Sequence, residues 1–161
     1  MFEICVFTAG EKDYADTILN FIDEDRTIIK HRLYRQHCVK PEQGVYVKDL
    51  SIIADRNIKD IILVDNSIIS FAFNLSNGVP IKAFLGEDND EELLYMVTFL
   101  EEIFAKDDVR PKIDETFKLK NLTQKYSQSA KNKKEEKKLL KTAQESLLVK
   151  NADGTNERSK K

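Results

Sequence analysis

The chain has 161 residues, 41% of them hydrophobic, and a formal net charge of -2, which allows one domain with a real core and a tail. Residues 1–122 carry 15 basic and 23 acidic side chains, whereas residues 123–161 carry 11 and 5, and an acidic body argues against direct nucleic-acid binding by residues 1–122. No apolar run predicts a transmembrane segment, and two cysteines without a signal peptide predict a reduced intracellular protein, nuclear or cytoplasmic.

The chain opens with a strand pattern followed by a helix pattern. Residues 1–8 are rich in β-branched and aromatic side chains, which predicts a strand that ends at Thr8. Ala9-Gly10 then predicts a turn. From Glu11 to about Asp23 the apolar residues recur at helical spacing, so we expect an amphipathic helix there.

A second strand pattern covers residues 27–34. A turn separates it from the short apolar segment 45–47, and we expect the two to pair as a β-hairpin. Lys48 follows that segment directly. A lone lysine is usually a solvated surface group, but this position could aim it into a site.

The most informative stretch is residues 60–67. Its four consecutive apolar residues, 61–64, predict a strand buried on both faces, as in the centre of a parallel sheet. The run stops at Asp65 and Asn66. Ligands of open α/β sheets bind beyond the carboxyl ends of the strands, so these two residues are candidates for chemistry. Asp-Asn-Ser is also ordinary turn chemistry, and that reading stays open.

The rest of the body predicts one more strand and one clear helix. Residues 79–81 form a short strand pattern in which Pro80 restricts pairing to a sheet edge. Residues 86–104 predict a helix with acids in its first turn, and we expect the helical run to end with Val109-Arg110-Pro111. Residues 123–161 form a basic, Lys-rich tail that we expect to be weakly helical or disordered.

Three predicted strand ends therefore carry a hydroxyl, an ammonium and a carboxylate next to an amide: Thr8, Lys48, and Asp65 with Asn66. A hydroxyl donates to a phosphoryl oxygen, and a lysine neutralises its charge. An acid suits Mg²⁺, which prefers oxygen ligands. The set predicts a site for a phosphoryl group and a metal ion, without a nucleophile.

Across residues 1–122 the chain resembles the FCP/SCP-type phosphatases, and its nearest branch is the small-phosphatase-like group. The resemblance is carried in order by Phe7-Thr8-Ala9-Gly10, Tyr14-Ala15-Asp16, Tyr34-Arg35-Gln36-His37-Cys38, Tyr46-Val47-Lys48-Asp49-Leu50, Val64-Asp65-Asn66-Ser67, Ser76-Asn77-Gly78-Val79-Pro80-Ile81, Asp108-Val109-Arg110-Pro111 and Phe117-Lys118-Leu119.

The resemblance implies an α/β fold: a haloacid-dehalogenase-like Rossmannoid parallel sheet, here lacking its first core strand, with a β-hairpin insert and a C-terminal tail. Thr8 matches the phosphate-binding threonine, and Lys48 matches the lysine that stabilises the transferred phosphoryl group. Asp65 matches the metal-binding acid, and Asn66 its active-site neighbour. The implied substrate is a protein phosphorylated on Ser or Thr, such as the RNA polymerase II C-terminal domain, and the implied cofactor is Mg²⁺, bound weakly here.

The family's nucleophile and general acid/base are the two acids of an Asp-x-Asp-x-Thr motif at the end of the first core strand. No such motif precedes Phe2, and Asp88-Asn89-Asp90 lies on the wrong side with no Thr following. Ile68, where the family usually has Pro, is a second departure. We therefore expect a phosphatase fragment that lacks its nucleophile and is inactive alone. The alternative is a non-catalytic protein-binding relative, like the family's mitochondrial import-receptor branch.

Overall fold

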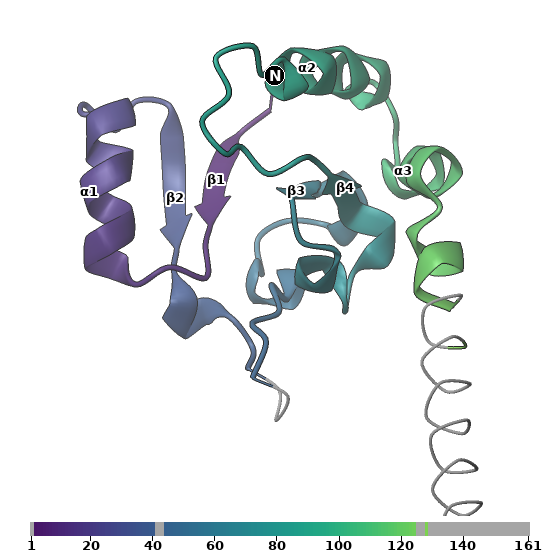
Figure 1. The fold of residues 1–161 in the computed structure, drawn as a ribbon. Helices are drawn as coiled ribbons and strands as arrows, with labels where there is room; N and C mark the ends of the chain where they lie inside the picture. Colours follow the sequence, from purple (N-terminus) through teal and green to yellow (C-terminus); the bar gives the residue numbers. More distant parts are fainter. Residues whose placement is uncertain (1, 41–43, 125–127, 129–161) are drawn as a thin grey trace, which may run out of the picture. The chain divides into compact units, whose positions relative to one another are not determined.

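The structure is a computed structural model that describes residues 2–40, 44–124 and 128. The chain divides into two units, residues 1–120 and 121–161. The helices and strands named below all belong to the first unit (Figure 1). Most of the predicted tail lies outside the described residues, so its weakly helical or disordered state stays a prediction.

The first unit begins with a strand, a helix and a second strand. These are β1 (Ile4–Phe7), α1 (Lys12–Ile22) and β2 (Ile29–Leu33). The two strands pair in parallel, with Phe7 opposite Leu33. Parallel neighbours need a crossover between them, and α1 provides it (Figure 1). The three elements lie where the sequence pattern predicts them.

The apolar face of α1 is only partly buried. Ala15 is its one buried residue. Tyr14 is 69% exposed and Phe21 is 91% exposed. The helical period thus predicted the helix and the side chains that share a face, but not what that face contacts.

The predicted β-hairpin is wrong. β2 pairs with β1, and residues 45–47 meet the preceding chain only at an isolated antiparallel bridge between Val39 and Val47. Two backbone hydrogen bonds of 2.9 and 2.8 Å form this bridge. A 3₁₀ turn at Arg35–His37 redirects the chain directly after β2, so the returning segment cannot lie along that strand. Lys48 therefore follows a single bridge and not a strand.

The second pair of strands is β3 (Leu63–Asp65) and β4 (Gly78–Pro80). They are also parallel, with Asp65 opposite Pro80. The strand around residue 63 is shorter than predicted, and it is not buried on both faces, because Val64 is 37% exposed. In the part of the chain that the structure describes, β4 is the only neighbour of β3.

The two strand pairs form two separate sheets instead of one. Among the described residues no hydrogen-bonded ladder joins β1 to β3, so each keeps one unpaired edge. Their carboxyl ends nevertheless lie close together. The Lys48 ammonium that pairs with Asp65 is 6.0 Å from the ring centroid of Phe7. The α/β class with parallel strands is confirmed, whereas a single continuous sheet is not observed.

Two further helices follow, α2 (Glu92–Ile103) and α3 (Arg110–Phe117). The first begins later than predicted, so Glu92 is the only acid in its first turn. Pro111 lies in the first turn of α3 and does not end a helix, contrary to the prediction, because the first turn of a helix tolerates a residue without an N–H donor. Among the described residues, none of the helices has the length and apolar composition that a membrane crossing requires.

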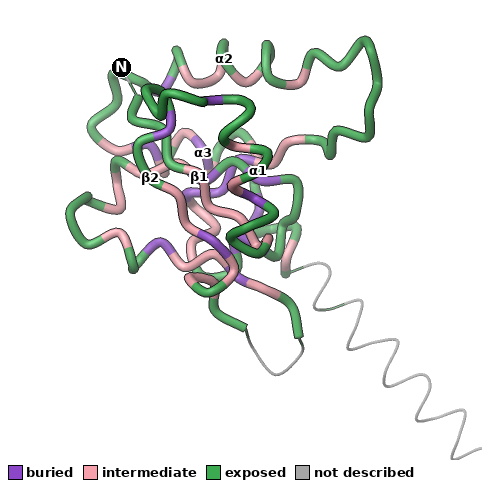
Figure 2. The backbone as a smooth tube through the Cα atoms, turned by 90° about the vertical axis from the view of Figure 1, so that its left-hand side faces the viewer, coloured by how far each residue is buried: buried purple, intermediate pink, exposed green. Residues whose placement is uncertain are grey.

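The core consists of two clusters of buried side chains. One contains Leu50, Leu63, Phe71 and Leu119, and the other contains Val79, Ile103, Val109 and Ile113. In Figure 2 α2 is mostly exposed or half-buried, and Ile103 is its one buried residue. Gly78 is required at its position, because an added Cβ would lie 2.5 Å from the Phe71 ring, and Phe71 is fully buried.

Candidate phosphate-binding site

The centre of the candidate site is an ion pair between the Lys48 ammonium and the Asp65 carboxylate. The two side chains are only 12% and 8% exposed. Asp65 ends β3, and the Lys48 backbone N–H donates to the Ser70 carbonyl at 3.2 Å, which holds the two segments together. The fold thus joins two predicted site residues that are 17 positions apart in the sequence.

Asp65 also forms the turn that its sequence context allows. Its second carboxylate oxygen accepts a hydrogen bond from the Ser67 N–H at 2.8 Å. Its carbonyl oxygen accepts one from the Ile81 N–H at 3.2 Å, next to β4. Asp65 can therefore form the turn and belong to the site at the same time, because one carboxylate oxygen binds the Ser67 N–H and the other binds Lys48.

Thr8 lies directly after β1, at the neighbouring strand end. Its hydroxyl oxygen accepts a hydrogen bond from the Gly10 N–H at 3.0 Å, and its backbone N–H donates to the Leu33 carbonyl at 2.9 Å. No hydrogen bond joins this hydroxyl to Lys48 or Asp65 among the described residues. The hydroxyl hydrogen thus remains available to a ligand.

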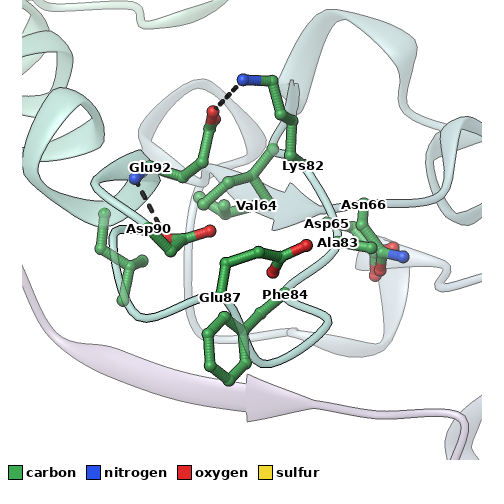
Figure 3. A pocket seen from close by; sticks show the side chains of 11 residues that line it. Val64, Asp65, Asn66, Lys82, Ala83, Phe84, Glu87, Asp90 and Glu92 are labelled. Atoms are coloured by element: carbon green, nitrogen blue, oxygen red, sulfur yellow. Dashed lines mark hydrogen bonds and ion pairs between the residues drawn. The ribbon is translucent and has the colours of Figure 1, made fainter.

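Asn66 is exposed and lines a cavity of about 680 Å³ next to Asp65. Figure 3 shows Asp65 and Asn66 side by side at one end of this pocket. The remaining lining residues come from β3, from the segment that connects β4 to α2 and from the first residues of α2. The amide is therefore placed at the rim of a space that could take a ligand.

Two residues that the sequence left without a site role border the candidate site. The Arg35 guanidinium donates to the Ala9 carbonyl at 2.6 Å, and its backbone N–H donates to the Gly10 carbonyl at 3.0 Å, so Arg35 fixes the loop after Thr8. The Cys38 thiol donates to the Thr8 carbonyl at 3.7 Å. Burial raises the pKa of this thiol, and the nearby charges of Lys48 and Arg35 oppose that rise. Both residues lie in the Tyr34–Cys38 motif, and this motif is the sequence feature that could have indicated their position beside the site.

The described residues do not by themselves form a magnesium centre. Mg²⁺ needs near-octahedral oxygen coordination. Lys48 and the Ser67 N–H already occupy the two carboxylate oxygens of Asp65. Within the described ranges, no three His, Cys, Asp or Glu side chains gather in a way that could hold a metal ion. Weak Mg²⁺ binding through Asp65 remains a prediction.

No Asp-x-Asp-x-Thr motif precedes Phe2, but these letters do occur within the chain, at residues 23–27. The structure places them at the end of α1 and in the loop before β2, whereas the candidate site lies at the carboxyl ends of β1 and β3. Asp23 is 4% exposed. Its carboxylate accepts hydrogen bonds from the backbone N–H groups of Thr27 at 2.9 Å and Ile29 at 2.8 Å. This run caps a loop and does not present a nucleophile to the site.

The hydrogen bonds of the Asp23 carboxylate predict that the free energy of unfolding falls when the protein is acidified. The backbone N–H groups, that of Ile29 most strongly, lower the pKa of Asp23 from its ordinary 3.8. A lowered folded-state pKa stabilises the fold above about pH 4, and this stability is lost as the pH falls below the ordinary value. We expect Asp23→Asn to lower the urea midpoint at neutral pH and to flatten its decline on acidification.

Urea titrations followed by circular dichroism at a series of pH values measure this effect. Asp25→Asn is the matched control, since Asp25 is exposed and lies in the same loop. An unchanged pH profile for Asp23→Asn would contradict the capping role.

The parallel strand pairs define this chain as an α/β protein, and comparison with known proteins gives its family. Residues 1–110 match the NLI interacting factor-like phosphatases. The chain belongs to the NLI interacting factor-like phosphatase family. This confirms the resemblance to the FCP/SCP-type phosphatases.

Several curated proteins are similar to this chain. CTD small phosphatase-like protein 2 of Dictyostelium discoideum is 45% identical over 122 residues, which cover 76% of this chain and 21% of that protein. CTD small phosphatase-like protein 3 of Caenorhabditis elegans is 46% identical over 102 residues, or 63% and 35% of the two chains. CTD nuclear envelope phosphatase 1B of Danio rerio is 33% identical, with 68% and 44% covered. The chain thus spans less than half the length of each of these relatives.

Proposed function

We propose that residues 1–120 bind the phosphoryl group of a phosphoprotein, as part of a protein serine/threonine phosphatase domain. The observation that carries the proposal is the nearly buried Lys48–Asp65 pair at the carboxyl end of β3, close to Phe7 at the end of β1, in a chain of a phosphatase family. A lysine in this position neutralises phosphoryl charge in a site of low dielectric constant. The Thr8 hydroxyl and the Asn66 amide supply further hydrogen bonds.

We also propose that the nucleophile comes from an Asp-x-Asp-x-Thr strand outside residues 1–161. Among the described residues, Asp65 is the only carboxylate at the end of β1 or β3, and it is already bound to Lys48. The unpaired edges of β1 and β3 offer hydrogen-bonding partners to such a strand. The substrate would be a phosphorylated protein such as the RNA polymerase II C-terminal domain, and Asp65 would be one ligand of Mg²⁺. A nuclear or cytoplasmic location stays a prediction.

Binding of inorganic phosphate tests the anion site without any need for turnover. We expect Lys48→Gln and Thr8→Val each to weaken phosphate binding by at least about tenfold, because hydrogen bonds to a charged group contribute about 1.5–3 kcal/mol. Isothermal titration calorimetry measures the affinity, and circular dichroism confirms that each variant is folded.

The control is Lys106→Gln, which removes the same charge from an exposed position. Its phosphate affinity should equal that of the unmodified chain. If phosphate binds equally well to all four proteins, the anion lies elsewhere and these site assignments are wrong. If none of them binds phosphate, the chain fits the non-catalytic, protein-binding reading of the family.

A further inference from the structure

The pocket beside Asp65 and Asn66 carries charged side chains that the phosphoryl site does not explain. Its volume is about 680 Å³, and much of its lining comes from the segment between β4 and α2. In Figure 3 the Glu87 carboxylate points toward the end of the pocket that holds Asp65 and Asn66, and Asp90 lies farther from that end. A substrate whose phosphorylated side chain binds next to Asp65 would therefore place its neighbouring residues close to Glu87 and Asp90.

The charges that line the pocket are unbalanced. Four carboxylates, those of Asp65, Glu87, Asp90 and Glu92, face one ammonium, that of Lys82. Lys48 forms an ion pair with Asp65 and compensates its charge, and Lys82 pairs with Glu92 at 2.6 Å (Figure 3). Neither Glu87 nor Asp90 forms an ion pair with any of the described residues.

Glu87 is held in its ionised form. Its carboxylate accepts a hydrogen bond from the Leu85 N–H at 2.9 Å. The N–H groups of Leu85 and of Glu87 itself lower the pKa of the Glu87 carboxyl. Glu87 therefore adds a negative charge at neutral pH near the proposed phosphoryl position. The Asp90 carboxylate accepts a hydrogen bond from the Glu92 N–H at 3.2 Å.

The same pocket also has apolar walls. Phe84 and Leu93 both line it, and each is 69% exposed. Lysine and arginine pack their aliphatic stems on such surfaces and keep their charged heads among polar groups. An arginine can also stack on an aromatic ring. An apolar wall with two unpaired carboxylates therefore fits a Lys or Arg side chain better than an acidic or a purely apolar one.

We propose that this pocket selects phosphoproteins that carry a Lys or Arg near the phosphorylated residue. The inference rests on the proposed phosphoryl site at Lys48 and Asp65 and adds the chemistry of the adjoining substrate residue. The acids of the pocket repel a phosphoryl group nearby, and a cation on the same substrate offsets that repulsion. Acidic residues at the same position add to it and are disfavoured.

Short peptides with a central phosphoserine test the proposal by fluorescence anisotropy with the full chain. One peptide carries arginine on both sides of the phosphoserine, and its partner carries glutamate. We expect the arginine peptide to bind at least about tenfold more tightly at low salt, a difference of about 1.4 kcal/mol. The preference should shrink as salt screens the charges.

A double variant, Glu87→Gln with Asp90→Asn, should remove most of this preference. The matched control, Glu101→Gln with Asp107→Asn, changes the net charge equally at exposed positions outside the pocket, and the preference should persist. Equal loss in both variants would show a general charge effect and overturn the inference. Equal binding of the two peptides to the unmodified chain, or no binding of either, would also overturn it.

An arginine peptide without phosphate separates this inference from the proposed function. If the phosphate strengthens binding but arginine and glutamate peptides bind alike, the phosphoryl site stands and the pocket inference fails. If the arginine preference depends on Glu87 and Asp90 but the phosphate adds nothing, the pocket is confirmed and the proposed phosphoryl site fails.

Discussion

Joined to an upstream segment that ends in an Asp-x-Asp-x-Thr strand, residues 1–161 are expected to hydrolyse p-nitrophenyl phosphate in the presence of Mg²⁺. The chain alone is expected to show no hydrolysis above background. The reason is chemical. Lys48 and Thr8 can bind a phosphoryl group but do not serve as the nucleophile that accepts it covalently. Asp65 does not serve as that nucleophile either, because its carboxylate is bound to Lys48. Loss of a nucleophile lowers turnover by up to about 10⁶-fold in well-studied enzymes.

The same addition should raise stability. β1 and β3 each have one unpaired edge among the described residues. Each hydrogen bond that a new strand forms with these edges contributes about 0.5–1.5 kcal/mol net. A strand that pairs with both edges would form several such bonds at once and would cover Ile4 and Val64, which are 47% and 37% exposed. We therefore expect the urea midpoint to rise together with activity.

The assay compares the chain with and without the segment, supplied on the same polypeptide. A segment with the first Asp of the motif changed to Asn is the matched control, since it should restore stability without activity. Lys48→Ala and Asp65→Asn should each abolish turnover in the joined protein. Turnover by the short chain that depends on Lys48 and Asp65 would show that its nucleophile lies within residues 1–161.

Lys48→Ala is expected to cause the largest loss of stability among single changes at the site, about 3 kcal/mol. The Asp65 side chain is 8% exposed, so removing its partner leaves a nearly buried carboxylate without a compensating charge. The double change Lys48→Met with Asp65→Asn removes both charges and should cost less than Lys48→Ala alone. This order of stabilities distinguishes an ion-pair effect from a loss of packing.

The unmodified chain, Lys48→Met, Asp65→Asn and the double change form a closed double-mutant cycle, and their urea unfolding measures the coupling between the two residues. Lys82→Ala is the control, because Lys82 also pairs with a carboxylate, that of Glu92, but is 82% exposed. Water screens exposed pairs, so its loss should have a much smaller effect. Equal effects of Lys48→Ala and Lys82→Ala would show that burial of the Lys48–Asp65 pair does not matter for stability.

The sequence by itself determined the elements that depend on local pattern and short motifs. The β-branched run before Thr8 predicted β1, and the helical period after Glu11 predicted α1. The family followed from motifs of three to six residues, since these keep their order and spacing. Asp65 could be selected as a site residue because it is the first polar residue after the apolar run 61–64.

Only the tertiary structure decided which segments meet. Strand partners are chosen by hydrogen bonds between distant residues, so β2 pairs with β1 and not with residues 45–47. The Lys48–Asp65 pair joins residues 17 positions apart, and no local pattern specifies that contact. Residues 23–27 carry the letters of a catalytic motif, but three backbone N–H groups hold the Asp23 carboxylate in a loop. What a carboxylate can do depends on its hydrogen-bond partners, and the fold supplies those partners.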